Sequence, residues 1–235
     1  MVYLYNIIFY RPILNALVFF YNTIAFRDFG LAIIFTTLLV RIILYPLFHK
    51  GSHQNMMMQR LQPKIKQIQE THKNDKEKQS RALMDLYKEH GVNPFSGILL
   101  LIVQIPILIA LYQIVRSGLG VTALSQLYSF VTAPSNINNT FLGLINLGNK
   151  NIVLVVLAAV AQYFQAKLAI YRTKGAEPSQ AQKIASQMVF VGPIITIFIF
   201  YNFPAAVGLY WLASSAFSVF QQLIINKKLK EKYGE

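Results

Sequence analysis

Residues 29–48 read FGLAIIFTTLLVRIILYPLF, a run of apolar side chains that contains one charged residue, Arg41. About 20 apolar residues in a helix that rises 1.5 Å per residue are enough to cross a hydrocarbon core of roughly 30 Å. Four further apolar windows follow along the chain, at 95–116, 151–171, 188–203 and 205–225. The sequence therefore predicts an all-α membrane protein with five transmembrane helices.

The composition of the chain agrees with a membrane protein. Of its 235 residues, 54% are hydrophobic and 13% are charged, which leaves too little polar surface for a soluble domain of this length. The 22 Lys and Arg outnumber the 9 Asp and Glu, giving a net charge of +13, which suits contact with anionic phospholipid or nucleic acid. The absence of cysteine excludes disulfides, thiolate metal sites and a cysteine nucleophile.

The distribution of Lys and Arg predicts the topology, because short loops rich in these residues stay in the cytoplasm. Segment 49–94 holds nine of them, 172–187 holds three and the tail 226–235 holds four, whereas 117–150 holds only Lys150. We therefore expect 117–150 outside, with the N-terminus outside and the C-terminus in the cytoplasm. No transit peptide is recognisable, which favours a bacterial plasma membrane.

Segment 1–28 precedes the first predicted span. Within it, residues 12–26 place Asn15 and Asn22 on one face of a helix. We expect this helix to lie in the outer membrane interface. A sixth span is the alternative.

The predicted cytoplasmic segment 49–94 carries apolar residues at helical spacing in two groups. The first group is Leu61, Ile65 and Ile68, and the second is Leu83, Leu86 and Tyr87. This spacing predicts a helical hairpin whose two arms pair as a short antiparallel coiled coil.

Arg41 is the most informative residue, because a charge at this depth costs about 2.5 to 3.5 kcal/mol and normally faces a bundle interior or a water-filled cavity. The five predicted spans contain no Asp or Glu. Neutral polar groups remain as partners: Thr36, Thr37, Gln104, Gln162, Gln165, Ser214 and Ser215. One interpretation is a wet, positively charged groove that attracts acidic or polar segments of another protein. The other is an arginine that reaches the cytoplasmic headgroups along its own helix.

The sequence does not indicate an enzyme, a metal site or a cofactor. All four histidines, His49, His53, His72 and His90, lie in the predicted hairpin, so none is available within the bilayer for acid–base chemistry. No phosphate-binding glycine loop or metalloprotease motif is present. Tyr210 and Trp211 open the last span, where aromatic rings commonly serve as interfacial anchors.

The order of several motifs resembles the YidC/Oxa/Alb family of membrane protein insertases. The motifs are LLVRIILYPL in the first span, MMMQRLQPKIKQIQ after it, LLIVQIPILIALY in the second span and FPAAVGLYWLASSAFSVFQQ in the last. The resemblance implies a five-helix core around a hydrophilic groove that is open to cytoplasm and lipid and closed outside. It assigns Arg41, Thr37, Gln162, Tyr210 and Trp211 to the groove, beside the neighbouring Gln104.

The resemblance also implies partners: nascent membrane proteins, the ribosome, the signal recognition particle pathway, the Sec translocon and membrane lipids. We expect no large extracytoplasmic domain between a first helix and the span of Arg41, unlike in the Gram-negative members, and no N-terminal lipoprotein cysteine, unlike in many Gram-positive ones. Segment 117–150 aligns poorly with the family. Two other classes stay open. One is a channel or small-solute transporter with Arg41 as an anion site, and the other is a structural assembly factor for membrane complexes.

Overall fold

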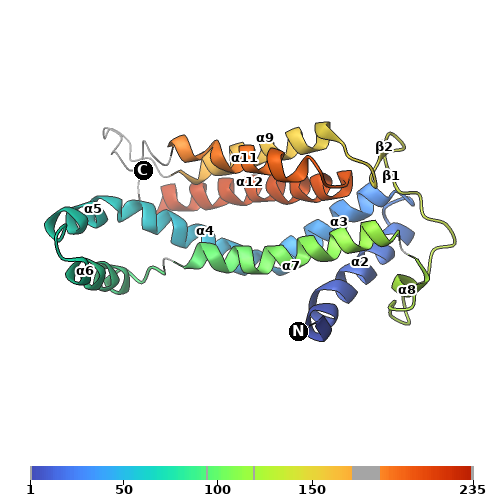
Figure 1. The fold of residues 1–235 in the computed structure, drawn as a ribbon, viewed down its shortest axis with the longest axis horizontal. Coiled ribbons are helices and arrows are strands. Elements are labelled where there is room, and N and C mark those ends of the chain that lie inside the picture. The colour runs from blue at the N-terminus through green and yellow to red at the C-terminus, as the bar shows by residue number, and fades with distance from the viewer. Residues whose placement is uncertain (1, 94, 119, 171–185, 234–235) are drawn as a thin grey trace.

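The computed structural model describes residues 2–93, 95–118, 120–170 and 186–233, and these form a helical bundle (Figure 1). Most of the predicted loop 172–187 lies outside the described residues. The helices in chain order are α1 (Val2–Tyr5), η1 (Asn6–Tyr10), α2 (Arg11–Asn22), α3 (Phe29–Ile43), α4 (Tyr45–Arg60), α5 (Gln62–Thr71), α6 (Lys76–Glu89), α7 (Ser96–Ser117), α8 (Val121–Leu124), α9 (Ile152–Ala169), α11 (Val191–Phe200) and α12 (Ala205–Tyr233). Two short strands, β1 (Thr140–Phe141) and β2 (Ile145–Asn146), pair antiparallel.

The prediction of an all-α membrane protein is confirmed. In the described part of the chain, three helices are long and apolar enough to cross a membrane, namely Val2–Asn22, Ile152–Ala169 and Ala205–Lys227. The consecutive helices α3 and α4 also meet this test as a bent pair, whereas Ile102–Ser117 and Ser186–Phe200 are shorter apolar helices. Every predicted window is therefore largely helical, and the number of spans stays a prediction.

The first predicted span is not a single straight helix from 29 to 48. The chain bends by 67° between α3 and α4, and Leu44 is the residue at the break. Pro46 follows within the first turn of α4, where its ring and missing N–H prevent continuation of the preceding helix. Because α4 runs on to Arg60, it turns away from α3 and extends toward the hairpin.

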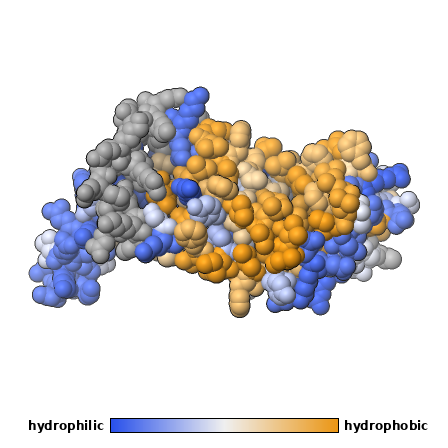
Figure 2. All heavy atoms as spheres, turned by 90° about the horizontal axis from the view of Figure 1, so that it is seen from above, coloured by the Kyte–Doolittle hydropathy of each residue, from blue (hydrophilic) through white to orange (hydrophobic). Residues whose placement is uncertain are grey.

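The bundle is elongated, with polar ends and an apolar middle. Figure 1 shows α3, α7, α9, α11 and α12 running along the long axis, with α5 and α6 at one end and the strands and α8 at the other. Figure 2 shows a broad hydrophobic band over the middle of the molecule and hydrophilic residues at both ends. An apolar belt of this kind matches the hydrocarbon layer of a bilayer.

The N-terminal helix differs from its predicted form. It begins at Val2 instead of near residue 12, so its length meets the requirement of the alternative sixth span. Asn15 is only 3% exposed, because its amide donates to the carbonyl of Gln126 and its Oδ1 accepts from the N–H of Tyr128. The polar face of α2 thus binds segment 117–150 instead of facing solvent.

The end of the bundle opposite the hairpin is tightly packed. Leu14, Leu17, Ile33, Ile114 and Leu209 are fully buried there and join α2, α3, α7 and α12 in one core. This apolar core fills the space between the four helices at that end.

The strand pair closes over the start of α3. The carboxylate of Asp28 accepts from the N–H of Leu31 at 2.8 Å and from the N–H of Leu142 at 2.6 Å. It therefore caps α3 and ties the loop between β1 and β2 to the same point. A Cβ added at Gly30 would lie 2.3 Å from Cδ2 of Phe141, so the strand pair needs a glycine beneath it.

We expect Gly30→Ala to destabilise the protein by about 1 to 3 kcal/mol, since overpacking of a filled core costs this much. Calorimetric melting in detergent would measure the change. The matched control is Gly208→Ala in α12, where the nearest atom lies 3.5 Å from the added Cβ and helix propensity favours alanine. Equal melting temperatures for the two variants would contradict the tight contact.

The hairpin arms pack through the residues that the spacing selects. Leu61, Ile65, Leu86 and Val92 are buried against one another, with Ile68, Leu83 and Tyr87 partly buried around them. The spacing in the sequence therefore identifies the contact face of the two arms.

Asp75 caps α6, and its carboxylate accepts from the N–H of Lys78 at 3.0 Å. This backbone hydrogen bond lowers the pKa of the Asp75 carboxyl. The stabilisation that the Asp75 cap gives to α6 is therefore fully present above the ordinary pKa of an aspartate, and it is lost as pH falls through the lowered value.

We expect Asp75→Ala to speed hydrogen exchange in the first turn of α6, while the exposed control Asp85→Ala leaves it unchanged. Unaltered exchange in Asp75→Ala would exclude the cap.

Candidate functional site

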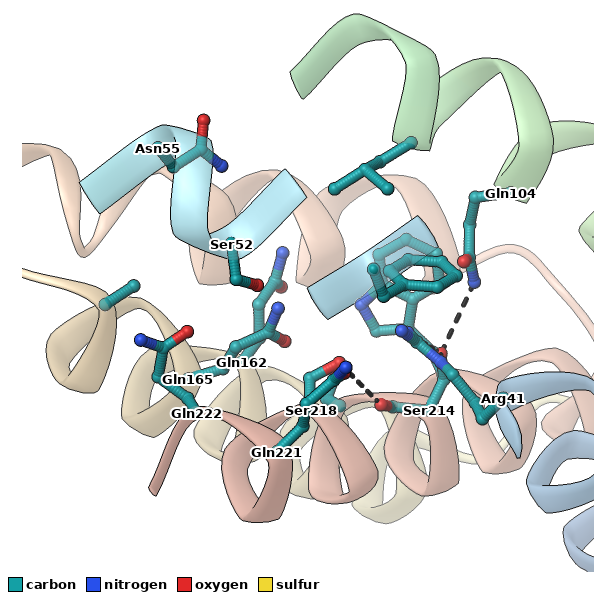
Figure 3. Close-up of a pocket in the computed structure, with 15 residues that line it drawn as sticks. Arg41, Ser52, Asn55, Gln104, Gln162, Gln165, Ser214, Ser218, Gln221 and Gln222 are labelled. Carbon is teal, nitrogen blue, oxygen red and sulfur yellow. Dashed lines mark hydrogen bonds between the residues drawn. The ribbon is translucent and has the colours of Figure 1, made fainter. Parts of the chain in front are cut away.

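A polar cavity of about 290 Å³ lies between the helices of the bundle (Figure 3). Side chains from α3, α4, α7, α9 and α12 line it. The lining is rich in amides and hydroxyls: Ser52, Asn55, Gln104, Gln162, Gln165, Ser214, Ser215, Ser218, Gln221 and Gln222. Arg41 is the one charged residue among the lining side chains that the structure describes.

Arg41 points into this cavity and is 7% exposed. Its Nε donates to Oγ of Ser214 at 2.9 Å, and its Nη2 donates to the same oxygen. The guanidinium carbon also lies 4.2 Å from the centre of the Phe48 ring. Nη1 is buried and has no hydrogen-bond partner among the described residues. The side chain therefore does not follow its helix to the headgroups, and one of its donors remains available inside the cavity.

Gln104 and Tyr210 extend this polar group from α7 and α12. The amide nitrogen of Gln104 donates to Oγ of Ser214 at 3.3 Å and also to the hydroxyl of Tyr210. Tyr210 is 4% exposed, so it lies inside the bundle and is not an interfacial anchor. Ser214 accepts hydrogen bonds from both Arg41 and Gln104 and joins three helices at one hydroxyl.

Trp211 and Gln162 border the same cavity from α12 and α9. The indole ring packs edge-on against Phe200 at 5.1 Å, and its Nε1 is buried without a hydrogen-bond partner in the described part of the chain. Gln162 accepts a hydrogen bond from the hydroxyl of Thr196 in α11. Two buried donors of cavity-lining residues, Nη1 of Arg41 and Nε1 of Trp211, therefore have no hydrogen-bond partner among the described residues.

Of the six predicted groove residues, Arg41, Gln104, Gln162 and Trp211 line the cavity, and Tyr210 is bonded to it through Gln104. Thr37 is not brought to it. The Thr37 hydroxyl is buried and donates to the carbonyl of Ile33 at 2.7 Å. A threonine in a helix commonly satisfies itself in this way.

Sequence reasoning missed five polar lining residues. Ser218, Gln221 and Gln222 follow Ser214 by four, seven and eight positions, which places them on one face of α12, and this spacing could have identified them. Ser52 and Asn55 of α4 carried no such signal. They reach the cavity because the chain bends at Leu44 and α4 therefore passes beside it.

The fold and the cavity define a helical, multi-pass membrane protein with a polar cavity between its helices. The chain belongs to the family described as 60Kd inner membrane protein, whose model matches residues 19–232. The resemblance to YidC-type proteins in the sequence is thereby confirmed.

Individual relatives give the same result. The chain is 34% identical over 221 residues to the "Membrane protein insertase YidC" of Geobacter sulfurreducens. The aligned region covers 93% of this chain and 37% of that protein. It is 33% identical to the protein of the same name from Geobacter metallireducens, with the same coverage. It is 32% identical over 200 residues to that of Francisella tularensis subsp. novicida, covering 85% of this chain and 33% of that protein. The chain thus spans little more than a third of the length of these relatives.

Proposed function

We propose that this chain inserts membrane proteins into the bilayer, the activity for which its relatives are named. The observation that carries the proposal is the buried guanidinium of Arg41 in a polar cavity, bonded to a neutral hydroxyl. The sequence of the predicted spans provides no carboxylate to neutralise it. A structural ion pair would have one, so an uncompensated cation suits a site that attracts polar or acidic segments in transit.

The mechanism we propose is energetic. A short polar tail that crosses a bilayer loses its hydration, and each unpaired backbone group costs several kcal/mol. Amides and hydroxyls inside the bundle replace part of that hydration, and the apolar client helix then moves into lipid. Leu, Ile, Phe and Val each favour insertion by about 0.3 to 0.6 kcal/mol, so the step needs no nucleotide, cofactor or catalytic group.

The proposed orientation in the membrane and the proposed partners follow from the distribution of Lys and Arg along the chain. The N-terminus is outside and the C-terminus in the cytoplasm, so the hairpin of α5 and α6 faces the ribosome. The basic hairpin and tail suit ribosomal RNA and anionic headgroups. Nascent membrane proteins are the clients, and the ribosome, the signal recognition particle pathway and the Sec translocon are the proposed partners.

The test is reconstitution of the purified chain into liposomes of phosphatidylethanolamine and phosphatidylglycerol. A single-span client with a short translocated tail is synthesised in their presence, and protease protection of the tail is measured. We expect protection well above that of empty liposomes. Protection at the level of empty liposomes would overturn the proposal.

Two competing functions predict other outcomes. A channel or solute transporter would release anions trapped in the same liposomes, whereas an insertase would not. A structural assembly factor would bind finished subunits and would not raise tail protection. Crosslinking from position 211 to a nascent chain on ribosomes distinguishes an insertase from such a factor.

A further inference from the structure

Two further hollows, of about 780 and 560 Å³, lie outside the polar cavity. The larger one lies between the N-terminal helix and α7. Figure 1 shows that the N-terminal helix runs obliquely to α7 and that the two approach each other near α8. The groove between them is separate from the polar cavity and shares no lining residue with it.

The groove has a polar side and an apolar side. Across it, the hydroxyl of Tyr5 donates to Oε1 of Gln113 at 2.9 Å, and the amide of Asn6 donates to Oε1 of Gln126 at 2.9 Å. Its apolar side includes Val2, 82% exposed, and Ile109, 42% exposed. A groove that is apolar on one side and polar on the other fits an amphiphile better than a sugar, a nucleotide or a wholly apolar helix.

Arg116 supplies the charge at the rim. One guanidinium nitrogen donates to the hydroxyl of Tyr112 at 3.1 Å, which leaves its other donors for a ligand. The sequence holds no Asp or Glu from residue 90 to residue 176, and the sole acidic residue before residue 70 is Asp28. The Asp28 carboxylate is occupied by the N–H groups of Leu31 and Leu142. No carboxylate in residues 1–69 or 90–176 is therefore free to pair with the guanidinium of Arg116.

We propose that this groove binds one anionic phospholipid from the leaflet away from the hairpin. The phosphate pairs with the guanidinium of Arg116, which suits phosphate in shape and charge. The glycerol and headgroup hydroxyls lie near the amides of Gln113 and Gln126, and one acyl chain follows Ile109 and Val2. A zwitterionic choline lipid brings a second cation toward Arg116 and should bind less well. The proposal is independent of the insertase function.

Native mass spectrometry of the full chain in detergent tests this site with added phosphatidylglycerol or phosphatidylcholine. We expect about ten-fold tighter binding of the first, equivalent to about 1.4 kcal/mol, and loss of that preference in Arg116→Gln. The matched control is Arg27→Gln, an exposed arginine outside the groove, which should retain the preference. Arg116→Lys keeps the charge and should retain part of it.

Three results would overturn the proposal: equal binding of the two lipids to the wild-type chain, an unchanged preference in Arg116→Gln, or the same loss in Arg27→Gln. The acyl chain is tested separately with glycerophosphoglycerol, the headgroup without chains. We expect it to compete at least ten-fold less well than the intact lipid, and equal competition would show that the apolar side of the groove plays no part. Insertion of clients is measured in a different assay, so failure here leaves that proposal intact.

Discussion

Arg41→Ala is expected to lower the insertion of a client with an acidic translocated tail by about ten-fold, while a client with a neutral tail loses much less. The buried guanidinium of Arg41 lines the cavity, and its Nη1 has no hydrogen-bond partner among the described residues. A hydrogen bond to a charged group is worth roughly 1.5 to 3 kcal/mol, and about 1.4 kcal/mol on a barrier changes a rate ten-fold. The measurement is the initial rate of tail protection in proteoliposomes for two clients that differ only in tail charge.

Two controls accompany this experiment. Arg41→Lys retains a cation and should preserve the preference for the acidic tail, and Arg27→Ala removes an exposed arginine from outside the cavity and should change neither rate. Equal loss for both tails in Arg41→Ala would exclude attraction of charge as the role of the residue. It would leave the assignment as an insertase standing, because the neutral client reports on that separately.

Ser214→Leu is expected to destabilise the protein by about 3 kcal/mol or more. Oγ of Ser214 accepts from both Arg41 and Gln104, and a leucine there leaves a buried guanidinium without its acceptor. Removing one partner of a buried charge typically costs about 3 to 5 kcal/mol. Calorimetric melting in detergent measures the loss, and Ser214→Thr, which keeps a hydroxyl, should melt close to the wild-type chain.

A double variant separates stability from activity. Arg41→Leu combined with Ser214→Leu removes the charge together with its acceptor, so the melting temperature should recover most of what Ser214→Leu loses. Insertion of the acidic client should not recover, because the cation is still absent. Recovery of both properties would mean that Arg41 serves only the packing of α3 against α12.

The fold class and the centre of the site could be predicted from sequence because both rest on one-dimensional signals. Runs of apolar residues give the spans, and a lone arginine within such a run must find polar partners. The candidates Ser214 and Gln104 were named on that ground, and the structure places them beside Arg41. The spacing of Leu61, Ile65 and Leu86 similarly selects the side chains that pack in the hairpin.

The remaining features depend on three-dimensional packing. Pro46 signals a break, but the 67° direction change that brings Ser52 and Asn55 to the cavity depends on how α4 packs against α7 and α12. Thr37 does not line the cavity, because its hydroxyl turns to the carbonyl of Ile33 in its own helix instead of to a neighbouring helix. The burial of Asn15 was unforeseen because its partners lie more than 100 residues away, in a loop without periodicity.

The position of Trp211 has a practical consequence. It is the single tryptophan of the chain, and its indole nitrogen lies buried at the wall of the chamber. Tryptophan emission, excited at wavelengths that the 13 tyrosines do not absorb, therefore originates at the site itself. Its wavelength follows the local hydration. A blue shift as a client segment displaces water would give an intrinsic optical reporter of occupancy, readable in real time and without a dye.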